Sequence, residues 1–431
     1  MPSLPKDFCT RIIEQYENGQ DLLDGLKTPP THSVLHNPRK SKEKITKPVA
    51  WNDHGEYLDE PASYFADPWV HAGVYYPQEA SSMFLGHVLK NTLTAENPVC
   101  LDMCAAPGGS SLMLQSHLNG KGLLVSNEVI SKRNFTLQES LAKWGYSNKV
   151  VIQAKADSVG RLGPLFDFML IDAPSSIEAR FRANHNTRET WKSADVAESS
   201  TIQREIVDNA KWGLKTGGIL VYATNTFAQE ENEDIVARLC SRGEFEAVDI
   251  PLEADWNIER PVSGAYQFFP HKAEGEGYFM TVLRRVKEVR PASIRAVKIP
   301  TIKLPGQIKL NDGLVAIRDK QLHAFPEQYL SYLHHLSQVK MHSVGTTLGE
   351  SKGPNFFPDH EVALALQISH EFPTVEISMD QAMAYFKKDT FTIDGPKGWV
   401  VLALEGHPLG WAKNLGSRIN NHYPTHWRIR S

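Results

Sequence analysis

Residues 101–111 of this chain read LDMCAAPGGSS, an apolar strand that ends in an acid and runs into small residues and two adjacent glycines. Small side chains and glycines let the backbone approach a ligand closely, and the helix that follows would offer its N-terminus to that ligand. The stretch lacks the G-x-G-x-x-G pattern of dinucleotide-binding loops, which disfavours a nicotinamide enzyme. We therefore interpret residues 101–111 as the cofactor loop of an α/β sheet.

Apolar runs of strand length alternate with helical stretches from about residue 81 to residue 285. Runs bounded by Gly, Pro and Asp are typical of buried parallel strands, and helices between them, such as residues 131–144, complete βαβ units. This pattern predicts an α/β fold with a doubly wound sheet. The expected strands lie in VCLDM (99–103), LLVSNE (123–128), VVIQAKAD (150–157), FDFMLIDAP (166–174), GILVYATN (218–225) and GEGYFMTVLRR (275–285).

Acidic residues close the first four of these strands. In open parallel sheets, ligands bind beyond the carboxyl ends of the strands. Asp102 and Asp172 close the first and fourth strands, Glu128 stands where an acid can accept hydrogen bonds from a ribose diol, and Asp157 where it can meet an adenine edge. Each acid alone is typical of a helix cap or a turn, but four strand ends in order, three with acids and one with glycines, favour a nucleoside-type cofactor.

The cofactor loop resembles LDMCAAPGGKT, a motif of the Nop/Sun family of RNA cytosine-C5 methyltransferases. The C-terminal residues 408–430, PLGWAKNLGSRINNHYPTHWRIR, resemble the end of the bacterial branch that methylates small-subunit ribosomal RNA and carries a PUA-like module. Other matches follow in the family's order: HAGVYYPQEASSM (71–83), the turn Asp172-Ala173-Pro174, YATNTFAQEENEDIV (222–236) and FFPHKAEGEGYF (268–279).

The resemblance implies an α/β fold with a seven-stranded Rossmann-like methyltransferase sheet, an N-terminal α+β piece and a C-terminal PUA-like β-rich domain. We expect an RNA-contacting region over residues 1–75, an S-adenosylmethionine-dependent methyltransferase domain over 76–287, a basic linker over 288–310 and an RNA-binding domain over 311–431. The implied partner is small-subunit ribosomal RNA, and the implied cofactor is S-adenosylmethionine. Its expected ligands are Asp102, Cys104, Ala105, Ala106, Pro107, Gly108, Gly109, Ser110, Glu128, Asp157 and Asp172.

Two positions that carry the family's chemistry are changed. In the family, a thiolate in a Tyr-Ser-Thr-Cys-Thr motif adds to C6 of cytosine, so that C5 can attack the methyl group, and a second cysteine, in Asp-Ala-Pro-Cys-Ser, helps to release the product. Here the first position is Asn225 and the second is Ser175, beside the retained Asp172. An amide is no nucleophile, and a hydroxyl is far weaker than a thiol. Covalent cytosine-C5 chemistry is therefore not expected.

Other departures lie in the same loops. The family's lysine after the two glycines is Ser110, and its glycine-rich stretch after the second cysteine reads Ile177-Glu178-Ala179-Arg180. The arginine expected before Asn37-Pro38 is replaced by Leu35 or His36. Three explanations fit: a catalytically silent RNA-binding or ribosome-assembly protein, a changed reaction such as heteroatom methylation, which needs no covalent step, or deliberate inactivation. A small-molecule methyltransferase is disfavoured by the basic flanks and the extra module.

Basic residues gather in three places: residues 27–47 and 287–309 hold six each, and four follow Gly410 without an acid. One such cluster is typical of a solvated surface, but three are compatible with a polyanionic partner. Aromatic residues interleave with the last cluster, as RNA contact requires; the core of a small β-rich domain explains them equally well, and the resemblance favours RNA. The expected RNA ligands are Lys413, Arg418, Tyr423, Trp427 and Arg428.

The composition suits a soluble globular protein of 431 residues with net charge −4. No apolar run approaches the ~20 residues of a membrane helix, and the N-terminus lacks the layout of an export signal. The four cysteines, Cys9, Cys100, Cys104 and Cys240, have no metal-ligand or C-x-x-C spacing. We therefore expect free thiols, no metal site, no membrane contact and a cytoplasmic monomer.

Overall fold

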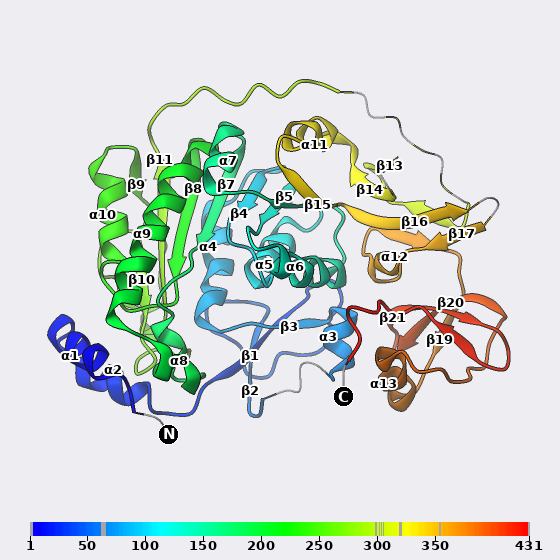
Figure 1. Cartoon of the computed structure of the whole chain (residues 1–431), viewed down its shortest axis with the longest axis horizontal. Coiled ribbons are helices and arrows are strands. Elements are labelled where there is room, and N and C mark those ends of the chain that lie inside the picture. The colour runs from blue at the N-terminus through cyan, green and yellow to red at the C-terminus, as the bar shows by residue number, and fades with distance from the viewer. Residues whose placement is uncertain are drawn as a thin grey trace.

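The computed structural model describes residues 3–61, 66–297, 300, 302, 304, 306–318, 321–352 and 355–429. A nine-stranded mixed sheet lies at its centre, in the order β10-β11-β8-β7-β4-β5-β6-β15, with β9 paired to β11 (Figure 1). The strands are β4 (Val99–Asp102), β5 (Leu123–Asn127), β6 (Lys149–Gln153), β7 (Phe166–Asp172), β8 (Leu214–Thr224), β9 (Phe245–Ala247), β10 (Ala265–Phe268), β11 (Tyr278–Arg285) and β15 (Lys340–Val344).

Five neighbouring strands, β6-β5-β4-β7-β8, are parallel, and β11 runs antiparallel between β8 and β10. Together these seven strands form the predicted Rossmann-like sheet, so the α/β class is confirmed. Helices cover both faces, and the predicted helix over 131–144 is α6. The helices are α4 (Phe84–Thr92), α5 (Gly109–Leu118), α6 (Ser131–Trp144), α7 (Ala156–Arg161), α8 (His185–Thr190), α9 (Ser193–Ala210) and α10 (Glu233–Ser241).

Alternation along the buried strands explains the two layers of helices. In β5, Leu124 packs in the cluster that includes α4, α5 and α6, whereas Leu123 and Val125 pack in the cluster that includes α7, α9 and α10. Successive side chains of a strand point to opposite faces, so a strand covered on both faces is apolar throughout. This arrangement leaves the strand ends as the place where polar side chains meet.

Strand β15 extends the sheet beyond the predicted seven strands. It comes from the region expected to form the C-terminal domain and pairs antiparallel with β6, with Lys340 opposite Gln153. Without it, β6 would present an unpaired edge, which proteins usually cover. The periodicity of a five-residue strand does not reveal its partner, and for that reason the sequence did not place it here.

The N-terminal piece is α+β, as predicted, and packs on the central sheet. Figure 1 shows α1 and α2 at one end of the molecule and a small sheet, β2-β1-β3, beside α3. The elements are α1 (Lys6–Gln15), α2 (Gly19–Gly25), β1 (His32–His36), β2 (Gly55–Leu58), α3 (Pro68–Ala72) and β3 (Tyr75–Pro77).

The C-terminal region is β-rich, as predicted, and contains two four-stranded sheets, β13-β14-β16-β17 and β19-β20-β21-β22, and a pair of strands, β12 and β18. No helix in the described ranges is long and apolar enough to cross a membrane. The elements are β12 (Ile308–Leu310), β13 (Leu314–Arg318), β14 (Leu322–Pro326), α11 (Leu330–Leu336), β16 (Thr346–Lys352), β17 (Asn355–Pro358), α12 (His360–Leu364), β18 (Ile368–His370), β19 (Thr374–Glu376), α13 (Met379–Lys387), β20 (Gly398–Leu404), β21 (His407–Asn414) and β22 (Ile419–Asn421).

Candidate cofactor and RNA site

A cavity of about 560 Å³, here called the cofactor cavity, lies at the carboxyl ends of the parallel strands. Its volume is within the ~300–1,000 Å³ usual for small-molecule pockets, and its place is where open α/β sheets bind ligands. The lining residues are Met103, Cys104, Ala106, Pro107, Glu128, Val129, Ile130, Arg133, Lys155, Ala156, Asp172, Ala173, Pro174, Ser175, Ile177, Arg180, Ile202, Glu205, Ile206 and Asn225.

The cofactor loop packs closely against two neighbouring segments. Gly108 has φ 132°, which side chains rarely adopt, and a Cβ there would lie 2.8 Å from Cβ of Ser140 in α6. A Cβ on Gly109 would lie 1.8 Å from Oε1 of Gln78. The two glycines therefore let the loop pack against the protein itself, in addition to any approach to a ligand.

Two acids at the strand ends differ in their access to the cavity. Asp102 is fully buried below the loop, where its Oδ2 accepts a hydrogen bond from Ser111 Oγ at 2.6 Å, and burial raises its pKa to about 7. Asp172 lines the cavity, and its buried Oδ1 has no hydrogen-bond partner among the described residues. Burial raises the pKa of Asp172 to about 6. Asp172 is thus the acid available to a ligand.

Glu128 lines the cavity from the end of β5. Its Oε1 accepts a hydrogen bond from the backbone N–H of Ile130 at 2.8 Å, and its Oε2 lies 3.4 Å from Nη1 of Arg133. Arg133 also donates to the carbonyl of Ala106 in the cofactor loop. These contacts hold the carboxylate at the cavity wall, where its remaining lone pairs can accept further hydrogen bonds.

Asp157 does not lie in this wall. It belongs to α7 rather than to the end of a strand, and its side chain is 45% exposed and forms an ion pair with Arg161 at 2.7 Å. That hydrogen bond holds its pKa below the ordinary value. At this strand end Lys155 and Ala156 line the cavity instead, so the proposed contact with an adenine edge stays a prediction.

The structure brings together seven of the expected site residues and leaves others outside the wall. The sequence did not predict that Arg133, Arg180 and residues of α9 line the cavity. In α9, Ile202, Glu205 and Ile206 have the i, i+3, i+4 spacing of one helical face. Those in the wall are Cys104, Ala106, Pro107, Glu128, Asp172, Ser175 and Asn225, and those outside it are Asp102, Ala105, Gly108, Gly109, Ser110 and Asp157.

Cys104 is the one thiol in the described wall of this cavity. Burial and, secondarily, the nearby Asp102 and Asp172 raise its pKa well above the ordinary value. A thiol must ionise to act as a nucleophile. Cys104 therefore does not replace the missing cysteines at neutral pH.

Buried carboxylates join the loops that present Ser175 and Asn225. Glu231, fully buried, accepts hydrogen bonds from the backbone N–H of Ser176 at 3.0 Å and from Gln203 at 2.7 Å. Burial raises its pKa to about 7. The backbone N–H of Ala179 also donates to the carbonyl of Asn225 at 3.2 Å. The two loops are therefore connected directly.

Glu178 makes a second connection and extends it to the N-terminal helix. Its Oε2 accepts hydrogen bonds from Thr226 Oγ1 at 2.9 Å and from the backbone N–H of Phe227 at 3.2 Å. Its Oε1 forms an ion pair with Arg11 of α1. Glu178 has no exposed surface, so these partners offset the cost of burying its charge.

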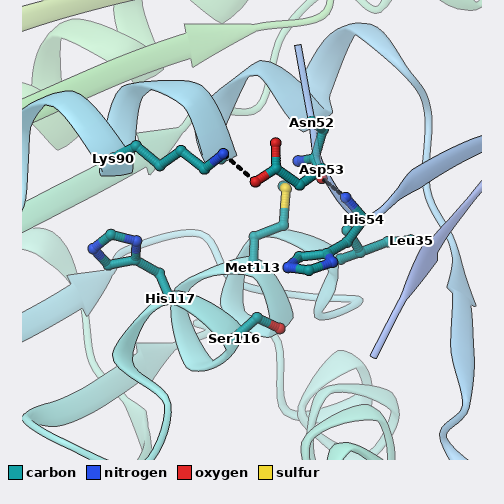
Figure 2. Close-up of a pocket in the computed structure, with 9 residues that line it drawn as sticks. Leu35, Asn52, Asp53, His54, Lys90, Met113, Ser116 and His117 are labelled. Atoms are coloured by element: carbon teal, nitrogen blue, oxygen red, sulfur yellow. Dashed lines mark hydrogen bonds and ion pairs between the residues drawn. The ribbon is translucent and has the colours of Figure 1, made fainter. Parts of the chain in front are cut away.

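A second hollow, shown in Figure 2, is much smaller. It holds about 80 Å³ between the N-terminal segment and helices α4 and α5. Asp53 points toward Lys90 there, and His117 and His54 lie on either side of Met113 in this view (Figure 2). Its volume is below that of small-molecule pockets, so it is not the cofactor site.

Residues 91–284 match the family described as 16S rRNA methyltransferase RsmB/F, and residues 372–429 match the Methyltransferase RsmF PUA domain. The chain is thus similar to the RsmB/F family of RNA methyltransferases in its central part and to the RsmF PUA domain near its C-terminus. It is 28% identical to the ribosomal RNA small subunit methyltransferase F of Aliivibrio fischeri (strain MJ11), over 98% of this chain and 97% of the relative. The protein of that name from Psychromonas ingrahamii is 29% identical over 98% and 96%.

A solved structure agrees with the fold. NSun6 from Pyrococcus horikoshii with SFG has a TM-score of 0.57 and 19% identity, covering 66% of this chain and 99% of that one. Together with the family match, this confirms the resemblance and the Rossmann-like methyltransferase fold that we inferred from the cofactor loop.

In the loop after Ser175, one residue has a left-handed backbone at a place where the resemblance implies a glycine-rich stretch. Ile177 has φ 53°, a left-handed conformation that is unusual for a β-branched residue. The family's glycine-rich stretch would adopt it without strain. Ile177 lines the cavity and is 39% exposed. The replacement therefore adds an apolar side chain to the cavity at a local cost in backbone strain.

In the RsmF PUA domain, the expected RNA ligands divide by exposure. Lys413, Arg418 and Arg428 are exposed, whereas Tyr423 is fully buried and Trp427 is 9% exposed. Both aromatic rings pack in the core of this domain. This agrees with the alternative interpretation of the sequence, in which the aromatic residues form the core of a small β-rich domain. The ring of Tyr423 is not available to stack on a base, and Arg430 lies outside the described residues.

Proposed function

We propose that this chain binds S-adenosylmethionine in the cofactor cavity and small-subunit ribosomal RNA beside it, without making 5-methylcytosine. One observation carries the proposal: Glu128 and Asp172 remain in the cavity wall, while Ser175 and Asn225 stand where the family has its cysteines. The residues expected to bind the cofactor are thus retained, whereas the cysteines that carry out the family's reaction are replaced. The proposal extends to this chain the substrate named for its relatives.

The residues present fit the cofactor. The cavity has the volume of a small-molecule pocket, and Glu128 offers acceptors for ribose hydroxyls. Oδ1 of Asp172 is buried and has no hydrogen-bond partner in the part of the chain that the structure describes. S-adenosylmethionine supplies an electrophilic methyl group when it is bound. The side chains of Arg133 and Glu128, joined to each other and to the carbonyl of Ala106, hold the loop that would face the cofactor.

No residue of the described wall supplies a thiolate for addition to C6. Asn225 has no nucleophilic atom, the Ser175 hydroxyl is a poor one, and burial keeps Cys104 protonated. Asp172 can accept a proton, since its pKa is raised to about 6. That property suits transfer to a nitrogen or oxygen atom, which needs orientation and a base but no covalent adduct.

Mass spectrometry of ribosomal RNA nucleosides, after incubation with S-adenosylmethionine labelled in its methyl group, tests the proposal. Label on a heteroatom would identify a changed reaction, and binding without label would identify a silent RNA-binding or ribosome-assembly protein. Labelled 5-methylcytosine would contradict the proposal. A cytoplasmic location and a monomeric state stay predictions, as do the boundaries of the four sequence regions.

A further inference from the structure

A second large cavity, of about 680 Å³, lies between helices α5 and α6, residues 70–77 and the end of the PUA domain. We call it the interdomain cleft; Tyr75, Tyr76, Lys143, His426, Trp427 and Arg428 line it. Figure 1 shows the C-terminal segment passing beside α3 at this place. Among the described residues, none lines both the cleft and the cofactor cavity.

One wall of the interdomain cleft is a single face of α6. Thr136, Glu139, Ser140 and Lys143 line it, and their i, i+3, i+4, i+7 spacing places them on one side of the helix. The ammonium of Lys143 lies 2.6 Å from Oε1 of Glu139 and 5.3 Å from the ring centre of Trp427. Lys143 thus neutralises the acid and lies beside an aromatic face.

The opposite wall is held in place by hydrogen bonds to α13 and within the C-terminal segment. The backbone N–H of Ile429 donates to the carbonyl of Phe386, and that of Trp427 to the carbonyl of Pro424, both at 3.1 Å. Lys388 donates to the carbonyl of Tyr423 at 2.6 Å. Arg428 lies in this fixed segment and is exposed.

The lining combines aromatic rings with a surplus of positive charge. Tyr75, Tyr76 and His426 supply rings to the cleft, whereas the ring of Trp427 packs mainly in the domain core. Because Glu139 is paired with Lys143, the Arg428 guanidinium has no other acid among the described lining residues and can bind an anion. Proteins recognise unpaired RNA nucleotides by stacking bases on aromatic rings and pairing phosphates with Arg or Lys. This chemistry fits a nucleotide better than a neutral or cationic ligand.

We propose that the interdomain cleft binds one unpaired nucleotide of the RNA substrate, with its base among the rings and its phosphate on Arg428. The proposal rests on the proposed function, because it requires that the chain bind RNA. The cleft lies next to the cofactor loop: Ser140, which lines it, donates from Oγ to the carbonyl of Pro107 at 2.9 Å. A nucleotide held here would anchor the RNA beside the cofactor cavity.

The test uses the full chain and a small-subunit ribosomal RNA fragment that carries 4-thiouridine in its unpaired segments. We expect photo-crosslinks in peptides that contain residues 75–76 or 426–429. Arg428→Ala should weaken RNA binding about three- to tenfold and lower the log–log salt slope by about 0.7, the value for one phosphate contact on a single strand. Arg428→Lys should keep most of the affinity.

Lys397→Ala is the matched control, because Lys397 is an exposed cation of the same domain outside the cleft. It should change the affinity less than twofold, and circular dichroism should show all variants folded. If the crosslinks fall elsewhere and Arg428→Ala and Lys397→Ala have equal affinity for RNA, the cleft does not bind the nucleotide, although the chain still binds RNA. An unmodified chain that does not bind the RNA would overturn the proposed function, and the cleft with it.

Discussion

The carboxylate of Glu231 accepts a hydrogen bond from the backbone N–H of Ser176 at 3.0 Å, which joins the loop after β8 to the loop after β7. These are the loops that present Asn225 and Ser175 to the cofactor cavity. Glu178 joins them a second time and connects both to α1 through Arg11. The positions of the lost cysteines are therefore held by the protein before any substrate binds.

Replacing Glu128 by Ala should weaken the binding of S-adenosylmethionine tenfold or more, because a hydrogen bond to a charged group contributes about 1.5–3 kcal/mol. Isothermal calorimetry on the full chain measures it, and we expect micromolar or weaker affinity for the unmodified protein, given the Ser110 replacement. Asp157→Ala, outside the wall, provides the comparison and should change affinity less than Glu128→Ala. No binding at millimolar cofactor, or an equal affinity for Glu128→Ala and the unmodified chain, would refute the site.

The unmodified chain should form no covalent adduct with RNA that contains 5-fluorocytosine, because Asn225 cannot add to C6. The double variant Ser175→Cys with Asn225→Cys should restore the adduct, detected as a shifted band on a denaturing gel, if the cavity still positions cytosine near Asp172. Ser175→Cys alone is the control, since it lacks a thiol at position 225. An adduct from the unmodified chain would show that our interpretation of Asn225 is wrong.

Adding Ser110→Lys to that double variant restores the family residue at three of the changed positions, 110, 175 and 225. We expect the triple variant to form at least as much adduct as the double variant, measured on the same gel. If neither variant reacts although both bind RNA, the cavity no longer positions cytosine. That result would favour a catalytically silent RNA-binding or ribosome-assembly protein.

Glu231→Gln should flatten the dependence of stability on pH. Burial raises the pKa of Glu231 from 4.5 to about 7, so between these values the folded chain binds more protons than the unfolded chain. This contribution is complete below pH 4.5 and is lost as the pH rises through 7, by up to about 3 kcal/mol. Urea unfolding from pH 5 to 8 measures it, with the exposed Glu230→Gln as control. Identical pH profiles for Glu231→Gln and the unmodified chain would contradict the assignment.

Gly108→Ala should destabilise the fold by roughly 1–3 kcal/mol, because φ 132° is strained for alanine and the new Cβ would lie 2.8 Å from Cβ of Ser140. Thermal unfolding followed by circular dichroism measures the change. Gly306→Ala should be nearly neutral, since nothing lies within 4 Å of a Cβ there. Equal melting temperatures for the two variants would show that the loop relaxes around a side chain.

Sequence and structure agree most where the deciding pattern is local. Helix α6 occupies the predicted residues 131–144, and Glu128 and Asp172 line the cavity as expected from their places at strand ends. They differ where a side chain's direction depends on distant packing. Asp157 pairs with Arg161 on a helix instead of entering the cavity, and Tyr423 packs in the domain core.

The sequence by itself determined the fold class, the cofactor loop and the absence of both catalytic cysteines of the family. Each of these features depends on residues that are close together in the sequence. Only the tertiary structure decided that β15 covers the edge of β6, that Arg11 pairs with Glu178, 167 positions away, and that α6, β3 and the C-terminal segment enclose a cleft. Such contacts form between segments that are far apart in the sequence, and the residues near each contact do not indicate which distant residue it pairs with.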